Sequence, residues 1–257
     1  MAAKKSNPIN AGSTKRTFFQ KTFRFLKRLF VFLFIAQLIY IILLKWINPP
    51  ITITQLVSVV KGEGLKRDYI AIEQMSSNAR LAVIAEEDQL FPDHAGFDWK
   101  LIEKAIEHNE KKPTRIRGAS TLSQQTAKNV FLWQGRSWFR KGLEMYFTKM
   151  IEWIWGKKRI LEVYLNVVEM GKGVYGIEAA ARKFYNKSAK QLTRVEAAQI
   201  ASSLRNPKKY TVKPLSKAVA IRSGWVLRQM NNLEGDEDIQ YLIRDDVQTK
   251  KEKTSVK

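Results

Sequence analysis

Hydrophobic and polar positions divide the chain into one continuous apolar run and a long region of helical periodicity. Residues 29–44 are almost entirely apolar, and the run extends to Ile47 if Lys45 snorkels. This length is close to the ~20 residues that span a bilayer core. The run ends in Lys-Trp-Ile-Asn-Pro-Pro rather than in the small residues of a signal-peptide cleavage site. The pattern therefore predicts an uncleaved transmembrane anchor at 29–47.

The segment before the anchor is strongly basic. Residues 1–28 contain eight Lys or Arg and no acidic residue. The positive-inside rule places such a segment in the cytoplasm and the chain after Pro50 on the other side. We therefore expect a single-pass membrane protein with residues 1–28 cytoplasmic. In a bacterium this corresponds to the cytoplasmic (inner) membrane, with the following domain periplasmic.

Beyond the anchor, the pattern predicts a stem and then a mainly α domain. Residues 48–77 form the expected stem, with alternating residues at 51–54 and a glycine turn at 62–64. From Asn78 the apolar spacing is helical and strand signals are few. Four N-cap candidates mark helix starts, namely Asp98, Thr121 with Gln124, Thr193 with Glu196, and Ser216. We assign 78–233 to one domain, and 234–257 to a C-terminal helix and polar tail.

Charge narrows the classes of partner. The net charge of +21 suits a polyanion, either nucleic acid, an anionic membrane or a phosphate-bearing substrate. A domain exported across the membrane does not meet chromosomal DNA, so nucleic acid is excluded as the expected partner. The chain has no cysteine, which excludes disulfides, thiolate catalysis and cysteine zinc sites.

Candidate chemistry gathers in an acidic turn after the apolar helix that ends at Ala85. The turn holds Glu86, Glu87, Asp88, Asp93, His94 and Asp98. A helix C-terminus carries partial negative charge, so carboxylates there have raised pKa values unless cations converge on them. Such a group suits proton transfer near neutral pH. A solvated acidic loop, or a metal site made of Glu86, Glu87, Asp88, Asp93 and His94, are the other interpretations.

Two further polar patterns follow the acidic turn. Thr121, Gln124, Gln125 and Lys128 share one face of a helix, which could bind an oxyanion or could simply be solvated. Arg140 lies one turn before Glu144, a spacing that usually gives a weak surface ion pair.

These stretches and two later ones resemble, in order, the five signatures of the peptidoglycan glycosyltransferases, glycosyltransferase family 51. The first signature, E-D-x-x-F-x-x-H-x-G, matches Glu87, Asp88, Phe91, His94 and Gly96. The others match Gly118–Asn129, Arg140 with Lys141 and Glu144, Lys157–Asn166, and Tyr175–Tyr185. In the last, Phe184-Tyr185 reverses the usual order of the pair. The resemblance covers residues 78–207.

The resemblance implies a lysozyme-like, mainly helical domain of the monofunctional transglycosylase type. Its expected reaction polymerises lipid II into β-1,4 glycan strands, with inversion and release of undecaprenyl diphosphate. The implied partners are lipid II, the lipid-linked glycan chain, the membrane and other cell-wall or division proteins. A divalent cation such as Mg²⁺ bound with the diphosphate is the one expected cofactor, and no organic cofactor is implied.

The resemblance also carries residue roles. It makes Glu87 the general base and Glu144 a second catalytic residue, with Asp88, Phe91 and His94 supporting them. The expected substrate and diphosphate contacts are Thr121, Gln124, Gln125, Lys128, Asn129, Arg140 and Lys141. Glu144 is expected to hold the cations, to bind a divalent ion or to assist at the donor phosphate. The alternatives are a lysozyme-like glycan-cleaving enzyme and a non-enzymatic, membrane-anchored scaffold.

Overall fold

A long apolar helix forms the first part of the chain. The computed structural model describes residues 11–114, 116–135 and 137–244, and its contacts divide the chain after Leu44. Helix α1 (Ala11–Leu43) contains a stretch, Phe18–Leu43, with a mean hydropathy of 2.1. This stretch is long and apolar enough to cross a membrane, which is consistent with a single-pass anchor. It starts before the predicted 29–47 and ends earlier, because helix-forming Lys and Arg among aromatic residues extend the helix toward its N-terminus.

The expected basic segment, 1–28, therefore does not end where the helix begins. Residues 11–28 belong to α1, while residues 1–10 lie outside the described residues. The polar tail from Gln248 also lies outside them. Of the expected 234–257 region, the structure describes a short helix, α11 (Glu237–Ile243), which Asp236 caps.

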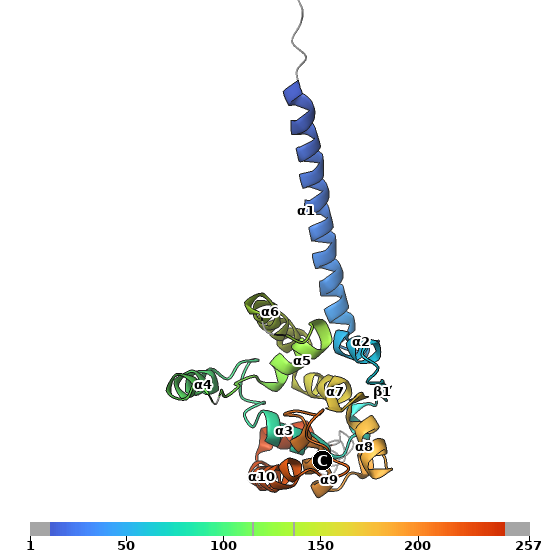
Figure 1. Cartoon of the computed structure of the whole chain (residues 1–257), viewed down its shortest axis with the longest axis vertical. Coiled ribbons are helices and arrows are strands. Elements are labelled where there is room, and N and C mark those ends of the chain that lie inside the picture. Colours follow the sequence, from blue (N-terminus) through green and yellow to red (C-terminus); the bar gives the residue numbers. More distant parts are fainter. Residues whose placement is uncertain (1–10, 115, 136, 245–257) are drawn as a thin grey trace, which may run out of the picture. The chain divides into compact units, whose positions relative to one another are not determined.

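The second unit is built around helix α3 (Ser77–Glu87). Every residue from Ala79 to Ala85 is buried, so α3 is enclosed on all sides rather than amphipathic. It packs against α9 (Arg194–Ser203), α10 (Lys217–Leu233) and α11. Figure 1 shows α3, α9 and α10 together. The burial of α3 fixes the position of the acidic turn at its C-terminus.

A second group of helices packs around α5 (Leu122–Phe131). Its neighbours are α2 (Ile53–Val60), α6 (Trp138–Ile154) and α7 (Lys157–Val167). Helix α4 (Trp99–Lys111) stands at the side of the domain in Figure 1, and Ala105 is its one buried residue. The predicted N-caps Asp98, Thr121, Thr193 and Ser216 all accept a hydrogen bond from a backbone amide of their helix. The sequence thus predicted these helix starts correctly.

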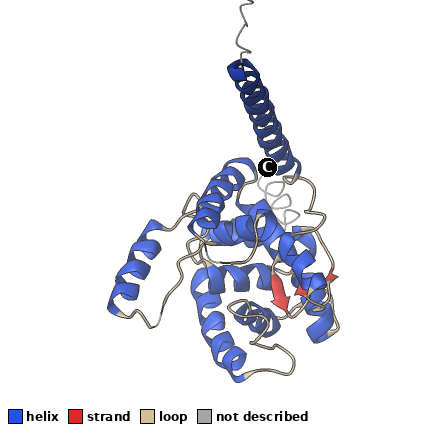
Figure 2. Ribbon diagram, turned by 45° about the horizontal axis from the view of Figure 1, so that its top comes forward, coloured by secondary structure: helices blue, strands red, loops and turns tan. Residues whose placement is uncertain are grey.

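A small three-stranded sheet lies beside α8 (Ile177–Tyr185), and Figure 2 shows its strands in red. Its order is β1 (Lys66–Arg67), β3 (Val174–Tyr175) and β2 (Glu169–Gly171), with β1 parallel and β2 antiparallel to β3. Two single-turn 3₁₀ helices complete the unit, η1 (Ile72–Gln74) and η2 (Ala189–Gln191).

The segment expected as a stem, 48–77, is folded into the domain. The alternating residues lead into α2 instead of a strand, because Thr52 and Gln55 form a capping box. Both side chains are buried, and Ser58 Oγ donates to the carbonyl of Gly64. Strand β1 adds the end of the segment to the sheet.

Candidate active site

Glu87 is the last residue of α3, and its carboxylate is held by a side chain of α5. Gln125 Nε2 donates to Glu87 Oε2 at 2.6 Å. The other amide atom of Gln125, Oε1, accepts from the Tyr164 hydroxyl at 3.2 Å. Among the described residues, the second carboxylate oxygen of Glu87 has no hydrogen-bond partner. The Tyr164–Gln125 chain thus orients Glu87 while leaving one oxygen for another partner.

The surroundings of Glu87 favour a proton acceptor that works near neutral pH. Burial raises the pKa of Glu87, while the hydrogen bond from Gln125 and the charges of Lys128, Arg205 and Arg222 lower it. The desolvation effect is the larger one, so the pKa stays above that of an ordinary glutamate. This is the direction that the sequence predicted, but the main cause is burial rather than the helix C-terminus.

Asp88 and His94 tie the turn to the start of α5. The Asp88 carboxylate is buried and accepts from His94 Nε2 at 3.0 Å and from the amide of Leu122 at 2.9 Å. His94 Nδ1 in turn accepts from the Gly96 amide at 3.1 Å, which assigns the Nε2–H tautomer. Phe91 is fully buried beneath this turn. These three residues therefore position Glu87 rather than line the cavity that α5 borders.

Thr121 and Gln124 are used for capping α5. Thr121 Oγ1 donates to the carbonyl of Gly96 at 2.7 Å and accepts from the amide of Gln124. Gln124 Oε1 accepts from the amide of Thr121, and both side chains are buried. The shared helix face expected from the sequence therefore divides, with Gln125, Lys128 and Asn129 toward the cavity and this pair toward the acidic turn.

Glu144 lies buried between two cations on α6. Its carboxylate accepts from Arg140 Nη1 at 2.7 Å and from Lys141 Nζ, and Glu144 is 2% exposed. The pair expected to be a weak surface ion pair is thus a buried cluster. Of the three roles open for Glu144, the contacts match the holding of these cations.

Lys128 lies within electrostatic reach of both acidic groups. Burial lowers the pKa of Lys128, and nearby Arg140 and Lys141 lower it further, whereas Glu144 and Glu87 raise it. Its ammonium makes no hydrogen bond or ion pair with the residues that the structure describes. A half-buried cation without an ion-pair partner among the described residues, lying near two carboxylates, is suited to bind an anion.

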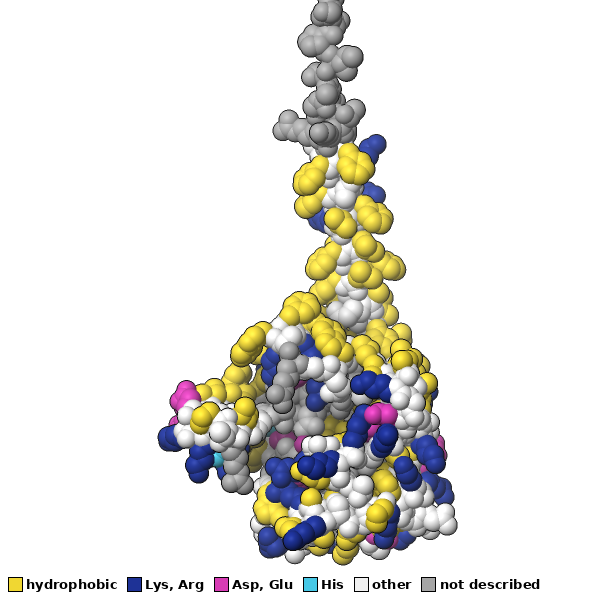
Figure 3. Space-filling view, in the orientation of Figure 1, with side chains coloured by type: hydrophobic (Ala, Val, Ile, Leu, Met, Phe, Trp, Pro, Cys, Tyr) yellow, Lys and Arg dark blue, Asp and Glu magenta, His cyan; other side chains and the backbone are white. Residues whose placement is uncertain are grey.

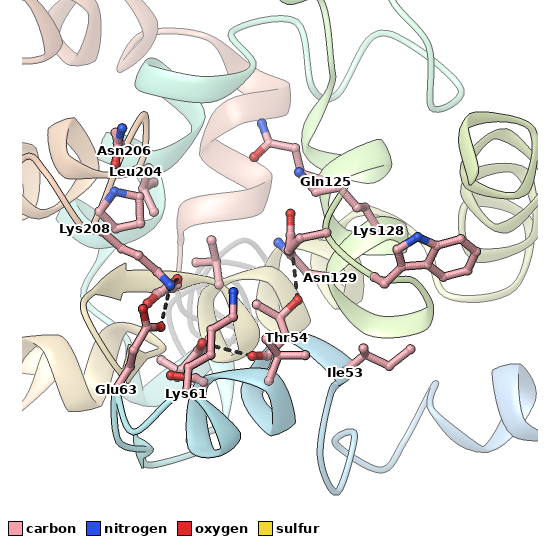
Figure 4. Close-up of a pocket in the computed structure, with 18 of the residues that line it drawn as sticks. Ile53, Thr54, Lys61, Glu63, Gln125, Lys128, Asn129, Leu204, Asn206 and Lys208 are labelled. Atoms are coloured by element: carbon pink, nitrogen blue, oxygen red, sulfur yellow. Dashed lines mark hydrogen bonds and ion pairs between the residues drawn. The ribbon is translucent and has the colours of Figure 1, made fainter. Parts of the chain in front are cut away.

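A cavity of about 460 Å³ opens beside these residues. Figure 4 shows Gln125, Lys128 and Asn129 of α5 facing Lys61 and Glu63 near the end of α2 and Lys208 after α9. Lys208 forms an ion pair with Glu63 across the cavity. A second cavity, of about 390 Å³, is lined by Glu87 together with Glu86, Asp88, Asp98 and α4 residues. Glu87 thus lines the second cavity, and its hydrogen-bond partner Gln125 lines the first.

The sequence reasoning missed several residues of this site. Arg205 after α9, Arg222 on α10 and Tyr164 on α7 act on the acidic turn. The two arginines have no local pattern that signals this, and Tyr164 stands within the fourth signature but was given no role. Lys61 and Glu63 were missed because 48–77 was read as a stem, and Lys208 lies just beyond residues 78–207, which the resemblance covers. In Figure 3, basic side chains surround the hollow of this domain, and acidic ones lie within it.

The acidic turn does not form the metal site weighed from the sequence. Within the described residues, no group of three or more His, Asp or Glu could hold a metal ion. Glu86 pairs with Arg222 and Asp88 pairs with His94, so their oxygens point to different partners. Glu144 is also occupied by its two cations.

Similarity to known proteins shows the family to which the chain belongs. The family model described as Transglycosylase matches residues 54–231, which include α2 and the whole acidic turn. The chain belongs to this transglycosylase family. It is 56% identical over 169 residues to proteins named biosynthetic peptidoglycan transglycosylase from Escherichia coli and Shigella boydii. The match covers 66% of this chain and 70% of each relative.

The family fixes the class of enzyme. The chain is a peptidoglycan glycosyltransferase of the monofunctional, biosynthetic type, with a mostly helical, lysozyme-like domain. Its substrates are accordingly lipid II or glycan chains. The glycan-cleaving and scaffold alternatives are set aside, since the relatives are named for biosynthesis.

Proposed function

We propose that this transglycosylase polymerises lipid II into β-1,4 glycan strands with inversion, and that Glu87 is its general base. The observation that carries the proposal is the oriented Glu87 carboxylate, which lines one cavity and is hydrogen-bonded to Gln125 at the edge of the other. A sugar 4-hydroxyl is a poor nucleophile at neutral pH, so a base must remove its proton. The raised pKa of Glu87 suits that task.

The leaving undecaprenyl diphosphate needs positive charge. Lys128 would meet the diphosphate first, because it lines the cavity and its ammonium has no ion-pair partner among the described residues. Arg140 and Lys141 would stabilise the same developing charge from α6, with Glu144 holding their positions. Gln125 and Asn129 would supply hydrogen bonds from α5. A divalent cation would be bound mainly by the diphosphate oxygens, because both Glu144 oxygens are already engaged.

The membrane surface is the proposed place of the reaction. Helix α1 would anchor the chain in the inner membrane, with its N-terminus cytoplasmic and the domain periplasmic. Exposed apolar side chains on α4 and α6 support work at a lipid surface, and they appear yellow in Figure 3. They include Trp99, Ile106, Trp138, Phe139 and Trp153. Other cell-wall or division proteins would meet the enzyme on the same membrane.

Polymerisation of labelled lipid II by the full chain in detergent tests the proposal. Glu87→Gln keeps the hydrogen-bonding shape and removes the base, so we expect a loss of about 10²- to 10⁴-fold in rate. Glu144→Gln should also reduce the rate, because it releases Arg140 and Lys141. Glu234→Gln is the matched control and should keep the wild-type rate, since Glu234 pairs with Arg194 and lies outside the five signatures. A folded Glu87→Gln variant that polymerises at the wild-type rate would refute the assignment.

A further inference from the structure

Glu86 is an unusual neighbour for a general base. Its side chain is 1% exposed although it is ionisable and stands directly before Glu87. Arg222 Nε donates to both of its oxygens, at 2.8 and 3.1 Å, and Arg205 Nε lies 3.8 Å from Oε1. A buried carboxylate with a dedicated arginine is expensive to maintain, and the mechanism above does not use it.

The arginine itself is held rigidly. The Arg222 guanidinium lies 3.5 Å from the ring centroid of Trp225, which is about one turn further along α10. This cation–π contact fixes the plane of the guanidinium, and Glu86 fixes its direction. Helix α10 packs on α3, so the charge of Arg222 has a fixed position next to the acidic turn.

The same charges act on Glu87. Arg222 and Arg205 both lower the pKa of Glu87, whereas the charge of Glu87 raises the pKa of Glu86. Lys128 on α5 and the Tyr164 hydroxyl on α7 also act on the two carboxylates. Asp88, Asp98, Lys100 and Lys104 line the same cavity as Glu86 and Glu87. Within the described residues, Glu86 is thus coupled to the proposed base on one side and to two arginines on the other.

We propose that the Glu86–Arg222 pair is a positioning device for the general base. Arg222 favours the ionised form of Glu87, and Glu86 holds the guanidinium in place while offsetting part of its charge. The inference rests on the proposed role of Glu87. The two partners have opposite effects: the charge of Arg222 opposes protonation of Glu87, and the charge of Glu86 promotes it.

The test is the pH profile of lipid II polymerisation by the full chain, measured between about pH 5 and pH 9. Arg222→Gln should move the acidic limb to higher pH, so that activity at the acidic end falls about threefold or more relative to the optimum. The pKa of Glu86 is about 7, so Glu86 carries its charge over the upper part of this limb, and Glu86→Gln should move that part of the limb to lower pH. Arg222→Lys keeps the charge and should restore most of the wild-type profile.

Arg194→Gln is the matched control. Arg194 links α9 to α10 through Glu234 at 3.0 Å and has no contact with the acidic turn among the described residues. Its loss should leave the limb unmoved. If Arg222→Gln and Glu86→Gln lower activity equally at every pH, the pair is only structural and the proposal is overturned. If Arg222→Gln does not fold, Glu86→Gln and Arg222→Lys still decide the question. A limb moved to lower pH in Glu86→Gln and nearly unmoved in Arg222→Lys supports the proposal, and an unmoved limb in Glu86→Gln overturns it.

The Glu87→Gln variant separates this inference from the proposed function. If Glu87→Gln retains wild-type activity, the general-base assignment fails and the limb has another origin. If Glu87→Gln is inactive while the Arg222 and Glu86 variants keep the wild-type limb, the positioning device alone is refuted.

Discussion

Lys128 connects the two acidic groups of the site, and its burial has a consequence at alkaline pH. Because burial lowers its pKa, Lys128 loses its proton at a less alkaline pH than an ordinary lysine. We expect polymerisation to decline on that limb, since a neutral amine cannot stabilise the diphosphate. Lys128→Arg should extend activity to higher pH, because the guanidinium stays charged. The exposed Lys183→Arg is the control, and an unchanged alkaline limb in Lys128→Arg would contradict the prediction.

Glu86 should also make folding depend on pH. Burial raises the pKa of Glu86 from 4.5 to about 7, so the folded state holds the proton more tightly than the unfolded state. Its stabilising contribution is therefore complete below the ordinary pKa and is lost as the pH rises through 7. The difference corresponds to at most about 3 kcal/mol.

Glu86→Gln removes this dependence because the amide does not titrate. Urea unfolding in detergent at about pH 5 and pH 8 should show a smaller loss of unfolding free energy in the variant than in the wild type. Equal losses in both proteins would show that Glu86 is already ionised in the folded state at the lower pH.

Sequence reasoning located the residues whose neighbours are local or whose motif is contiguous. Glu87, Lys128 and Glu144 stand within such motifs, and the structure brings them into one electrostatic cluster. Arg222 could not be found in this way, because it is 136 residues from Glu86 and its role depends on how α10 packs on α3. The division of the α5 face was missed for a similar reason, since Thr121 is drawn away by the carbonyl of Gly96.

At the scale of elements, the close packing of residues 48–77 on the sheet depends on Gly173. Its φ is +67°, and a Cβ there would collide with the backbone carbonyl of Glu63. Gly173→Ala should therefore lower the unfolding free energy by about 2 kcal/mol or more and disturb the cavity wall that Glu63 forms. Thermal unfolding in detergent measures this effect.

Gly142 provides the matched control for that substitution. It lies in α6, and nothing lies within 4 Å of an added Cβ. Gly142→Ala should raise the unfolding free energy by up to about 1 kcal/mol, because alanine favours a helix. Similar effects at both positions would mean that the stem is not packed through Gly173.

Helix starts were predictable because a cap is a short-range hydrogen bond. Thr193 and Ser216 each accept a hydrogen bond from the backbone amide three residues later, so both partners lie within one short stretch of sequence. The packing of residues 48–77 into the domain was harder to predict. Its capping box at Thr52 is local, but the pairing of Lys66 with Val174 joins strands that are far apart in the sequence.

For the whole molecule, the division after Leu44 allows the anchor to be tested apart from the chemistry. We expect the chain without residues 1–44 to polymerise lipid II in detergent at a rate close to that of the full chain. In lipid II vesicles its rate should fall by about tenfold or more, because anchoring raises the effective concentration of enzyme and substrate on one surface. An equal loss in both media would show instead that α1 is needed for folding.

The buried position of Glu144 has a consequence for turnover. Between reaction cycles, its carboxylate already satisfies Arg140 and Lys141, so the empty enzyme does not carry bare cations in a desolvated place. Under the proposed mechanism, an arriving diphosphate would share these cations with an internal competitor, and a departing one would leave them neutralised. Glu144 would then weaken retention of the product, which suits a chain-building enzyme that must clear the spent carrier in each cycle.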